Sequence, residues 1–351
     1  MREFNTPFDT APFDKIKTEH FMPAIQEGIR LAKEEIESIK SQALPTFENT
    51  IEALDLAGKK LGIISGIFFN LNSAETSDEI QKLAREISPL LTQHSNDILL
   101  DKDLFLRVQQ IFKQQDELKL SPEQKTLLEK TYKAFVRNGA NLSDEDADKL
   151  RKIDQELAQL SLQFGENVLA ETNKFVHFVS EESEVEGLPE SIKEAAAQTA
   201  EEKGKAGQWA FTLDYPSYIP AMTYLKNREL RKKLFIAYNT KSSKGDELDN
   251  QETIKKILNL RHQRAHLLGY SSHSHFVLEE RMAKSPKAVM DFLENLLVQA
   301  KPKAEEELEE LSKFANDLDG LERLEKWDFA YYSELLKKEK YELDDELLRP
   351  Y

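Results

Sequence analysis

The pattern in this 351-residue sequence that most resembles a metal site is HQRAH at 262–266. His262 and His266 stand at i and i+4, so on a helix both imidazoles leave the same face, which is the spacing of a zincin helix. A zincin also needs a glutamate directly after the first histidine as general base, and Gln263 stands there instead. Because a glutamine side chain cannot accept a proton, activation of a metal-bound water would lack its base.

His273 and His275 follow nearby and could complete a tetrahedral site. The alternative is that all four histidines are surface or helix-packing residues, and the residue types favour this alternative. We therefore assign no metal ligand and no catalytic residue to this chain. Its substrate-binding residues are unknown from the sequence.

Two further patterns have simpler explanations than chemistry. The acidic run EEELEEL at 305–311 could supply paired carboxylates, but at helical spacing it is typical of a solvated face. Tyrosines could line a peptide channel, although packing is their more common role. They gather in one stretch, at Tyr215, Tyr218, Tyr224 and Tyr238. No phosphate-binding loop, nucleophile elbow, dinucleotide-binding glycine pattern or Ser/His/Asp constellation is legible.

Helices are the elements expected to position these residues. Local signals predict helices from Thr18 to about Lys40, from Pro45 and Thr46 into the apolar run LGIISGIFFNL at 61–71, and from about Ser77 to Leu99. Ser121, with Pro122 and Gln124, forms a capping box for a helix that ends near Asn138–Gly139. Ser143 caps the clearest helix, whose apolar residues recur every three or four positions and indicate core packing: Leu150, Ile153, Leu157, Leu160, Phe164 and Val168.

The pattern changes to alternation around 173–186 and 207–214, which predicts a two-stranded β unit with a short helix between the strands that ends at Gly204. Helices resume at Asn227, Asp249, His273 and Ser285. The last is long, should be kinked at Pro302, and carries one apolar face: Val289, Phe292, Leu296, Leu297, Ala300, Ala304, Leu308, Leu311 and Ala315. The predicted class is all-α, mainly helical, with this small β unit.

Composition narrows the functional classes. Hydrophobic residues make up 40% of the chain and charged residues 32%, which is typical of a folded domain. A net charge of −16 disfavours nucleic acid as a partner. The chain has no cysteine, which excludes disulfides and thiolate metal sites. The longest apolar run is too short to cross a bilayer, so no membrane association is expected.

Six strings in a fixed order carry a resemblance to a known family. The longest is DYPSYIPAMTYLKNRELRKKLFIAYNTK at 214–241. The others are FDKIKTEHFMPAI at 13–25, PTFENTIEAL at 45–54, YKAFVRNGANLS at 132–143, LRHQRAHLLGY at 260–270 and WDFAYY at 327–332. Together they resemble the zinc oligopeptidases, the family of thimet oligopeptidase, neurolysin, oligopeptidase A and peptidyl-dipeptidase (dipeptidyl carboxypeptidase). The opening FNTPFDTAPFDKIKTEHF looks most like the peptidyl-dipeptidase branch.

The resemblance implies a two-lobed helical protein with a narrow channel that admits only short peptides. Zinc would be held by two histidines of an HExxH helix and a more distant glutamate, with the HExxH glutamate as base. No HExxH occurs in this chain, and HQRAH lies far upstream of the family's zinc helix. The resemblance therefore implies that 1–351 is an N-terminal helical lobe and channel wall. The catalytic zinc domain would be absent from it, and the lobe would be inactive and free of zinc alone.

Three interpretations stay open at this point. The first is part of a peptidase that releases C-terminal dipeptides. The second is part of an oligopeptidase A-like endopeptidase, and the third is a non-catalytic helical module that binds peptides. The end of the sequence at ELLRPY favours a fragment over a free-standing module. With no leader legible at the start, a cytoplasmic location is expected, or a periplasmic one if a leader has been removed.

Overall fold

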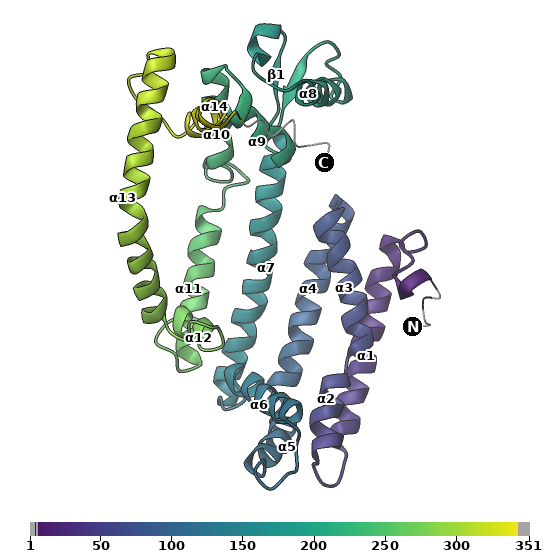
Figure 1. Ribbon diagram of the computed structural model, residues 1–351. Helices are drawn as coiled ribbons and strands as arrows, with labels where there is room; N and C mark the ends of the chain where they lie inside the picture. The colour runs from purple at the N-terminus through teal and green to yellow at the C-terminus, as the bar shows by residue number, and fades with distance from the viewer. Residues whose placement is uncertain (1–3, 5, 343–351) are drawn as a thin grey trace. The chain divides into compact units, whose positions relative to one another are not determined.

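A computed structural model describes residue 4 and residues 6–342, so the closing string ELLRPY lies outside the described residues. Helices dominate the described chain (Figure 1). They are α1 Phe21–Lys40, α2 Ala53–Leu56, α3 Lys59–Ala74, α4 Asp78–Leu99, α5 Lys102–Lys113, α6 Pro122–Arg137, α7 Asp144–Lys174, α8 Glu190–Glu202, α9 Tyr215–Tyr224, α10 Arg228–Asn239, α11 Gln251–Leu267, α12 His273–Leu278, α13 Pro286–Asp319 and α14 Phe329–Tyr341. Between residues 6 and 342, no helix is long and apolar enough to span a bilayer.

The small β unit consists of two three-residue strands, β1 His177–Val179 and β2 Trp209–Phe211. They pair antiparallel, with His177 opposite Phe211. The predicted class, mainly helical with one two-stranded unit, is confirmed. The strands are shorter than the predicted ranges: α7 continues to Lys174 before β1, and a 3-10 turn at Glu182–Val185 follows it.

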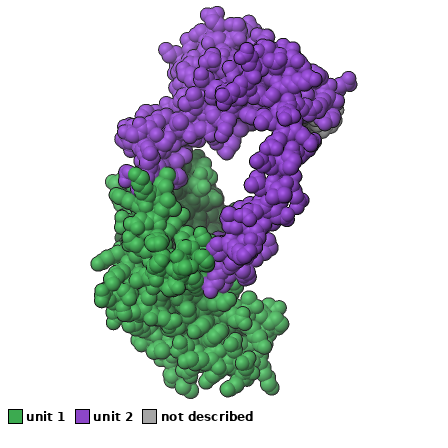
Figure 2. Space-filling view, turned by 90° about the vertical axis from the view of Figure 1, so that its left-hand side faces the viewer, with its two compact units in different colours: residues 1–163, 253–277 green, residues 164–252, 278–351 purple. Residues whose placement is uncertain are grey.

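The chain divides into two compact units, coloured green and purple in Figure 2. Unit 1 comprises residues 1–163 and 253–277, and unit 2 comprises residues 164–252 and 278–351. Each unit is therefore built from two separate stretches of sequence. This explains why no linker signal marks a boundary: the chain passes between the units inside α7, near the start of α11 and at the end of α12.

Unit 1 has its apolar residues in three clusters. Phe21, Ile25 and Phe68 belong to one that joins α1, α3 and α4, and its members are all but removed from solvent. A second cluster joins the end of α1 to α5 and α6, and a third packs α7 on α11 through Ile153, Leu160, Ile257 and Leu260. The predicted stripe on α7 is thus core at Leu150, Ile153 and Leu160, whereas Phe164 is 38% exposed.

Most predicted helix signals are confirmed by side-chain hydrogen bonds. Ser121 Oγ accepts from the Gln124 N–H, and Gln124 Oε1 accepts from the Ser121 N–H at 3.0 Å, which completes the capping box. Ser77 and Asn227 cap α4 and α10 in the same way, through the N–H groups of Ile80 and Leu230. Such caps need only residues three apart, so the sequence predicts them well.

Two helix predictions are corrected, and some helices have no counterpart among the predictions. Thr18 does not cap α1, because Thr18–His20 form a 3-10 turn in which His20 Nδ1 accepts from the Lys17 N–H, and α1 begins at Phe21. The second predicted helix is broken at Gly58, whose φ of 71° is left-handed and ends the run between α2 and α3. Helices α5, α9 and α14 are not predicted at all. Pro220 lies inside α9, and a proline in the middle of a segment favours the prediction of a loop over that of a helix.

Candidate functional site

The histidine pair of HQRAH lies near the end of α11 with both side chains exposed. The two rings lie 4.1 Å apart between centroids, and His266 Nδ1 is 3.0 Å from the backbone oxygen of His262. A nitrogen in that position donates to the carbonyl, which removes it from metal binding. Gln263 is exposed on the same helix and offers no base.

His273 and His275 do not complete a site with this pair. They lie on α12, where His275 Nδ1 is 2.8 Å from Ser272 Oγ. Burial, together with the nearby Arg261 and Arg264 guanidinium groups, lowers the pKa of His273. Among residue 4 and residues 6–342, no three His, Cys, Asp or Glu side chains are grouped so that they could hold a metal ion. The described residues therefore do not fit a zinc centre.

The tyrosine-rich stretch forms an aromatic cluster on α9 and α10. The rings of Tyr218 and Tyr238 stack at 4.1 Å, and Tyr215 meets Tyr238 edge-on at 6.3 Å. Tyr218 is buried, and burial raises the pKa of its hydroxyl to about 12. Tyr215 stays 68% exposed. Tyr218 thus has the packing role, and Tyr215 is the tyrosine of this cluster that is free to meet another molecule.

A buried ionic network that the sequence patterns do not predict lies in unit 2. Arg231 is 1% exposed and Asp328 0% exposed, and Arg231 Nη2 donates to Asp328 Oδ1 at 3.0 Å. Arg228 donates to both oxygens of Asp328, through Nε and Nη2, and the Glu325 N–H donates to Oδ2 at 3.0 Å. The remaining Arg231 donors reach the backbone oxygens of Leu225, Lys226 and Trp327.

The pKa of the Asp328 carboxyl reflects two opposed causes. Burial by itself raises it, but hydrogen bonds from Arg228, the Glu325 N–H and Arg231 outweigh burial and hold the pKa below its ordinary value. The network ties α10 to the segment that leads into α14. Two of the six resemblance strings, at 214–241 and 327–332, meet at this point. The sequence signal that could have pointed to the contact is that both strings belong to the same family resemblance.

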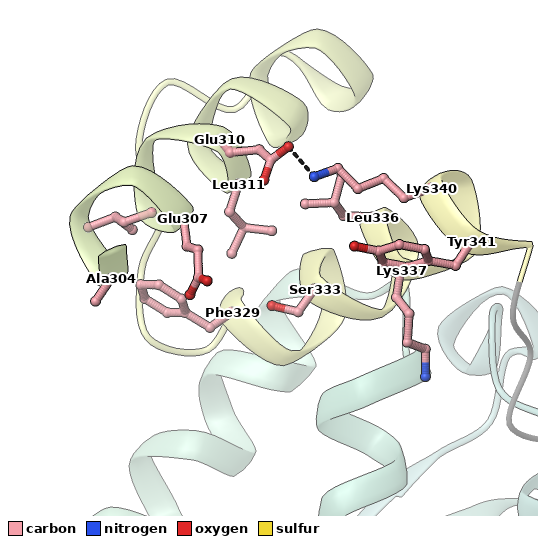
Figure 3. A pocket seen from close by; sticks show the side chains of 11 residues that line it. Ala304, Glu307, Glu310, Leu311, Phe329, Ser333, Leu336, Lys337, Lys340 and Tyr341 are labelled. Carbon is pink, nitrogen blue, oxygen red and sulfur yellow. Dashed lines mark ion pairs between the residues drawn. The ribbon is translucent and has the colours of Figure 1, made fainter. Parts of the chain in front are cut away.

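A hollow of unit 2 lies between α13 and α14 and has a volume of about 400 Å³ (Figure 3). Leu308, Leu311, Phe329 and Leu336 give it an apolar floor. Charged side chains stand at its edge, where Lys340 pairs with Glu310. The leucines of the acidic run line the hollow together with Glu307 and Glu310, whereas Glu305 and Glu306 pair with Lys301 and Lys303 on the exposed surface.

Known proteins resemble this chain along its whole length. Residues 221–351 match the family model described as Peptidase family M3. The chain is 35% identical to oligopeptidase A of Escherichia coli (strain K12) over 99% of its own length and 52% of that protein. It is 33% identical to dipeptidyl carboxypeptidase of the same organism, over 98% of the chain and 51% of that protein. A probable cytosolic oligopeptidase A of Arabidopsis thaliana is 33% identical over 98% of the chain and 50% of that protein. The chain thus spans about half the length of the curated relatives it matches.

Proposed function

Since this chain belongs to peptidase family M3, we propose that it is the N-terminal part of a zinc metallopeptidase that hydrolyses short peptides, in which it forms a wall of the substrate channel. The observation that carries the proposal is the similarity of 98–99% of the chain to both oligopeptidase A and dipeptidyl carboxypeptidase. Both of those proteins are about twice as long, which leaves room for a catalytic part beyond this one.

The proposal divides the labour between two parts of the protein. Peptide hydrolysis by such an enzyme needs a metal-bound water, a carboxylate base and donors for the developing oxyanion. The described residues bring no three metal ligands together, and Gln263 stands where a zincin has its base. The zinc and its ligands are therefore assigned to the part of the protein that lies outside this sequence. This chain restricts access and contacts substrate.

Release of C-terminal dipeptides is the specificity we propose. Its support is the resemblance of the opening string FNTPFDTAPFDKIKTEHF to the peptidyl-dipeptidase branch. Overall identity does not separate the branches, because oligopeptidase A at 35% and dipeptidyl carboxypeptidase at 33% are nearly equal. An endopeptidase of the oligopeptidase A type is the second candidate, supported by the same identities. A cytoplasmic location is part of the proposal.

The test extends the chain through its natural downstream sequence and supplies a short peptide with a blocked N-terminus. Mass spectrometry should show successive losses of two C-terminal residues, and a chelator should abolish them. The 351-residue chain serves as the matched control and should leave the peptide intact. Internal cuts without a dipeptide ladder would move the assignment to the endopeptidase. Chelator-resistant cleavage by the 351-residue chain would refute the proposal, including the division of labour.

A further inference from the structure

The long helix α13 is uncovered through its middle. Every residue from 291 to 310 is exposed, although the stretch contains large apolar side chains. Leu293 is 48% exposed, Leu297 is 60% exposed and Leu308 is 43% exposed. A surface helix ordinarily turns such residues toward a core, and contiguous exposed apolar surface marks an interaction site.

The exposed residues continue a line that is already buried at one end. At 100° per residue, Met290, Leu293, Leu297, Ala304 and Leu308 fall along one side of α13, and Leu311 and Ala315 extend the same line. Leu311 is 6% exposed and Ala315 0% exposed, because α14 packs on them with Tyr331 and Tyr332. One end of this line is therefore covered by a helix. The rest of the line is not buried by any described residue of unit 2.

The hollow of Figure 3 lies where the covered part gives way to the uncovered part. Leu308 and Ala304 of α13 form one side of it, and Phe329 of α14 lies opposite. Its volume of about 400 Å³ has room for large apolar side chains. Glu307 and Glu310 of α13 also line it, and the same part of the helix carries glutamates at 305, 306 and 309 and lysines at 301 and 303.

From this arrangement we infer that the α13 stripe, defined as Met290, Leu293, Leu297, Ala304 and Leu308, is the docking surface for the catalytic half of the same protein. The inference rests on the proposed function, because that half is the polypeptide the longer relatives possess and this sequence lacks. The occupant presents an apolar helix face that continues the packing of α14 along α13 and places large side chains in the hollow. Basic residues border that face and meet the glutamates.

The composition of the chain allows a direct test, because it contains no cysteine. A single introduced cysteine therefore reports the accessibility of its own position to a thiol reagent. Ala304→Cys and Leu297→Cys place the probe on the α13 stripe. Asn295→Cys is the matched control, since it is exposed on the same helix and stands about 180–200° around the axis from both probes.

In the 351-residue chain all three cysteines should react at similar rates. In the chain extended through its natural downstream sequence, the two stripe cysteines should react at about one tenth of that rate or more slowly still. Asn295→Cys should keep its rate. Equal rates for stripe and control in the extended chain would overturn the inference. So would a natural reading frame that ends at residue 351.

Protection of the stripe in the 351-residue chain would also overturn it, and the dependence on protein concentration would name the occupant. Protection that grows with concentration indicates a second copy, and protection that does not indicates another part of the same chain. Peptidase activity is measured on the same extended preparation. An active enzyme with an unprotected stripe refutes only the docking surface, and a protected stripe without any peptidase activity refutes only the proposed function.

Discussion

Replacing Asp328 by Asn should destabilise unit 2 severely, because it removes the charge that opposes a fully buried arginine. Asp328 accepts hydrogen bonds from Arg228, Arg231 and the Glu325 N–H, and it is completely buried. Arg228 is 37% exposed and can turn toward water, but Arg231 is 1% exposed and cannot. The variant therefore leaves an uncompensated guanidinium in the interior.

Breaking a buried ion pair by removing one partner costs about 3–5 kcal/mol. With a urea m-value of about 2 kcal/mol per molar, the denaturation midpoint of unit 2 should fall by about 1.5–2.5 M. The control is Glu186→Gln, which removes the charge from an exposed pair with Lys226 whose side chains are both 59% exposed. Such a solvent-exposed pair contributes little to stability, so the midpoint of this variant should move far less than that of Asp328→Asn.

Tryptophan fluorescence reports unit 2 selectively, because the only two tryptophans of the chain, Trp209 and Trp327, both belong to it. This choice matters, since a chain with two compact units need not unfold in one transition. A midpoint for Asp328→Asn equal to that of the Glu186→Gln control would refute the claim that the buried network holds α10 to α14.

The same pair predicts a pH dependence with a definite sign. The folded pKa of Asp328 lies below its ordinary value of 3.8, so the ionised carboxylate stabilises the fold fully above that value. This stabilisation is lost as the pH falls below 3.8 and through the lowered folded pKa. The stability difference between wild type and Asp328→Asn should therefore be largest near pH 7 and should shrink below about pH 4. A difference that stayed constant down to pH 3 would contradict the assignment of the effect to charge.

Three further predictions follow from other features. The 351-residue chain should hold no stoichiometric zinc after dialysis, and one zinc per chain that disappears when both HQRAH histidines are changed to alanine would overturn this. Leu160→Asp buries a charge on α7 and should cost several kcal/mol, lowering the melting temperature followed by circular dichroism, whereas Gln163→Asp at an exposed site should melt like wild type. Gly187→Ala should destabilise unit 2 far more than Gly204→Ala: both glycines have positive φ, but a Cβ at 187 meets the Tyr224 backbone oxygen at 2.3 Å and one at 204 meets nothing within 4 Å. Equal fluorescence midpoints for the two alanine variants would show that the chain shifts to relieve the contact.

Features that depend on neighbours in the sequence were predictable. Ser121, Ser77 and Asn227 cap helices through N–H groups three residues away, so the chain needs no tertiary contact to specify them. The helical class and the β unit follow from periodicity in the same way. The six strings, in their order along the chain, resemble the peptidase family. This resemblance depends on residue identity alone and needs no knowledge of the fold. The absence of HExxH is equally a fact of the sequence.

Tertiary structure decided what happens between residues far apart in the chain. Arg231 and Asp328 are 97 residues apart, and no sequence pattern near either residue indicates that the two are buried against each other. The apolar face of α13 looks in the sequence like any core stripe, yet only Leu311 and Ala315 are buried on it. Periodicity specifies that a face is apolar, but burial of that face depends on whether another element packs against it. In the described structure no such element covers most of α13. The sequence pattern by itself could not distinguish a helix face that is buried from one that stays exposed.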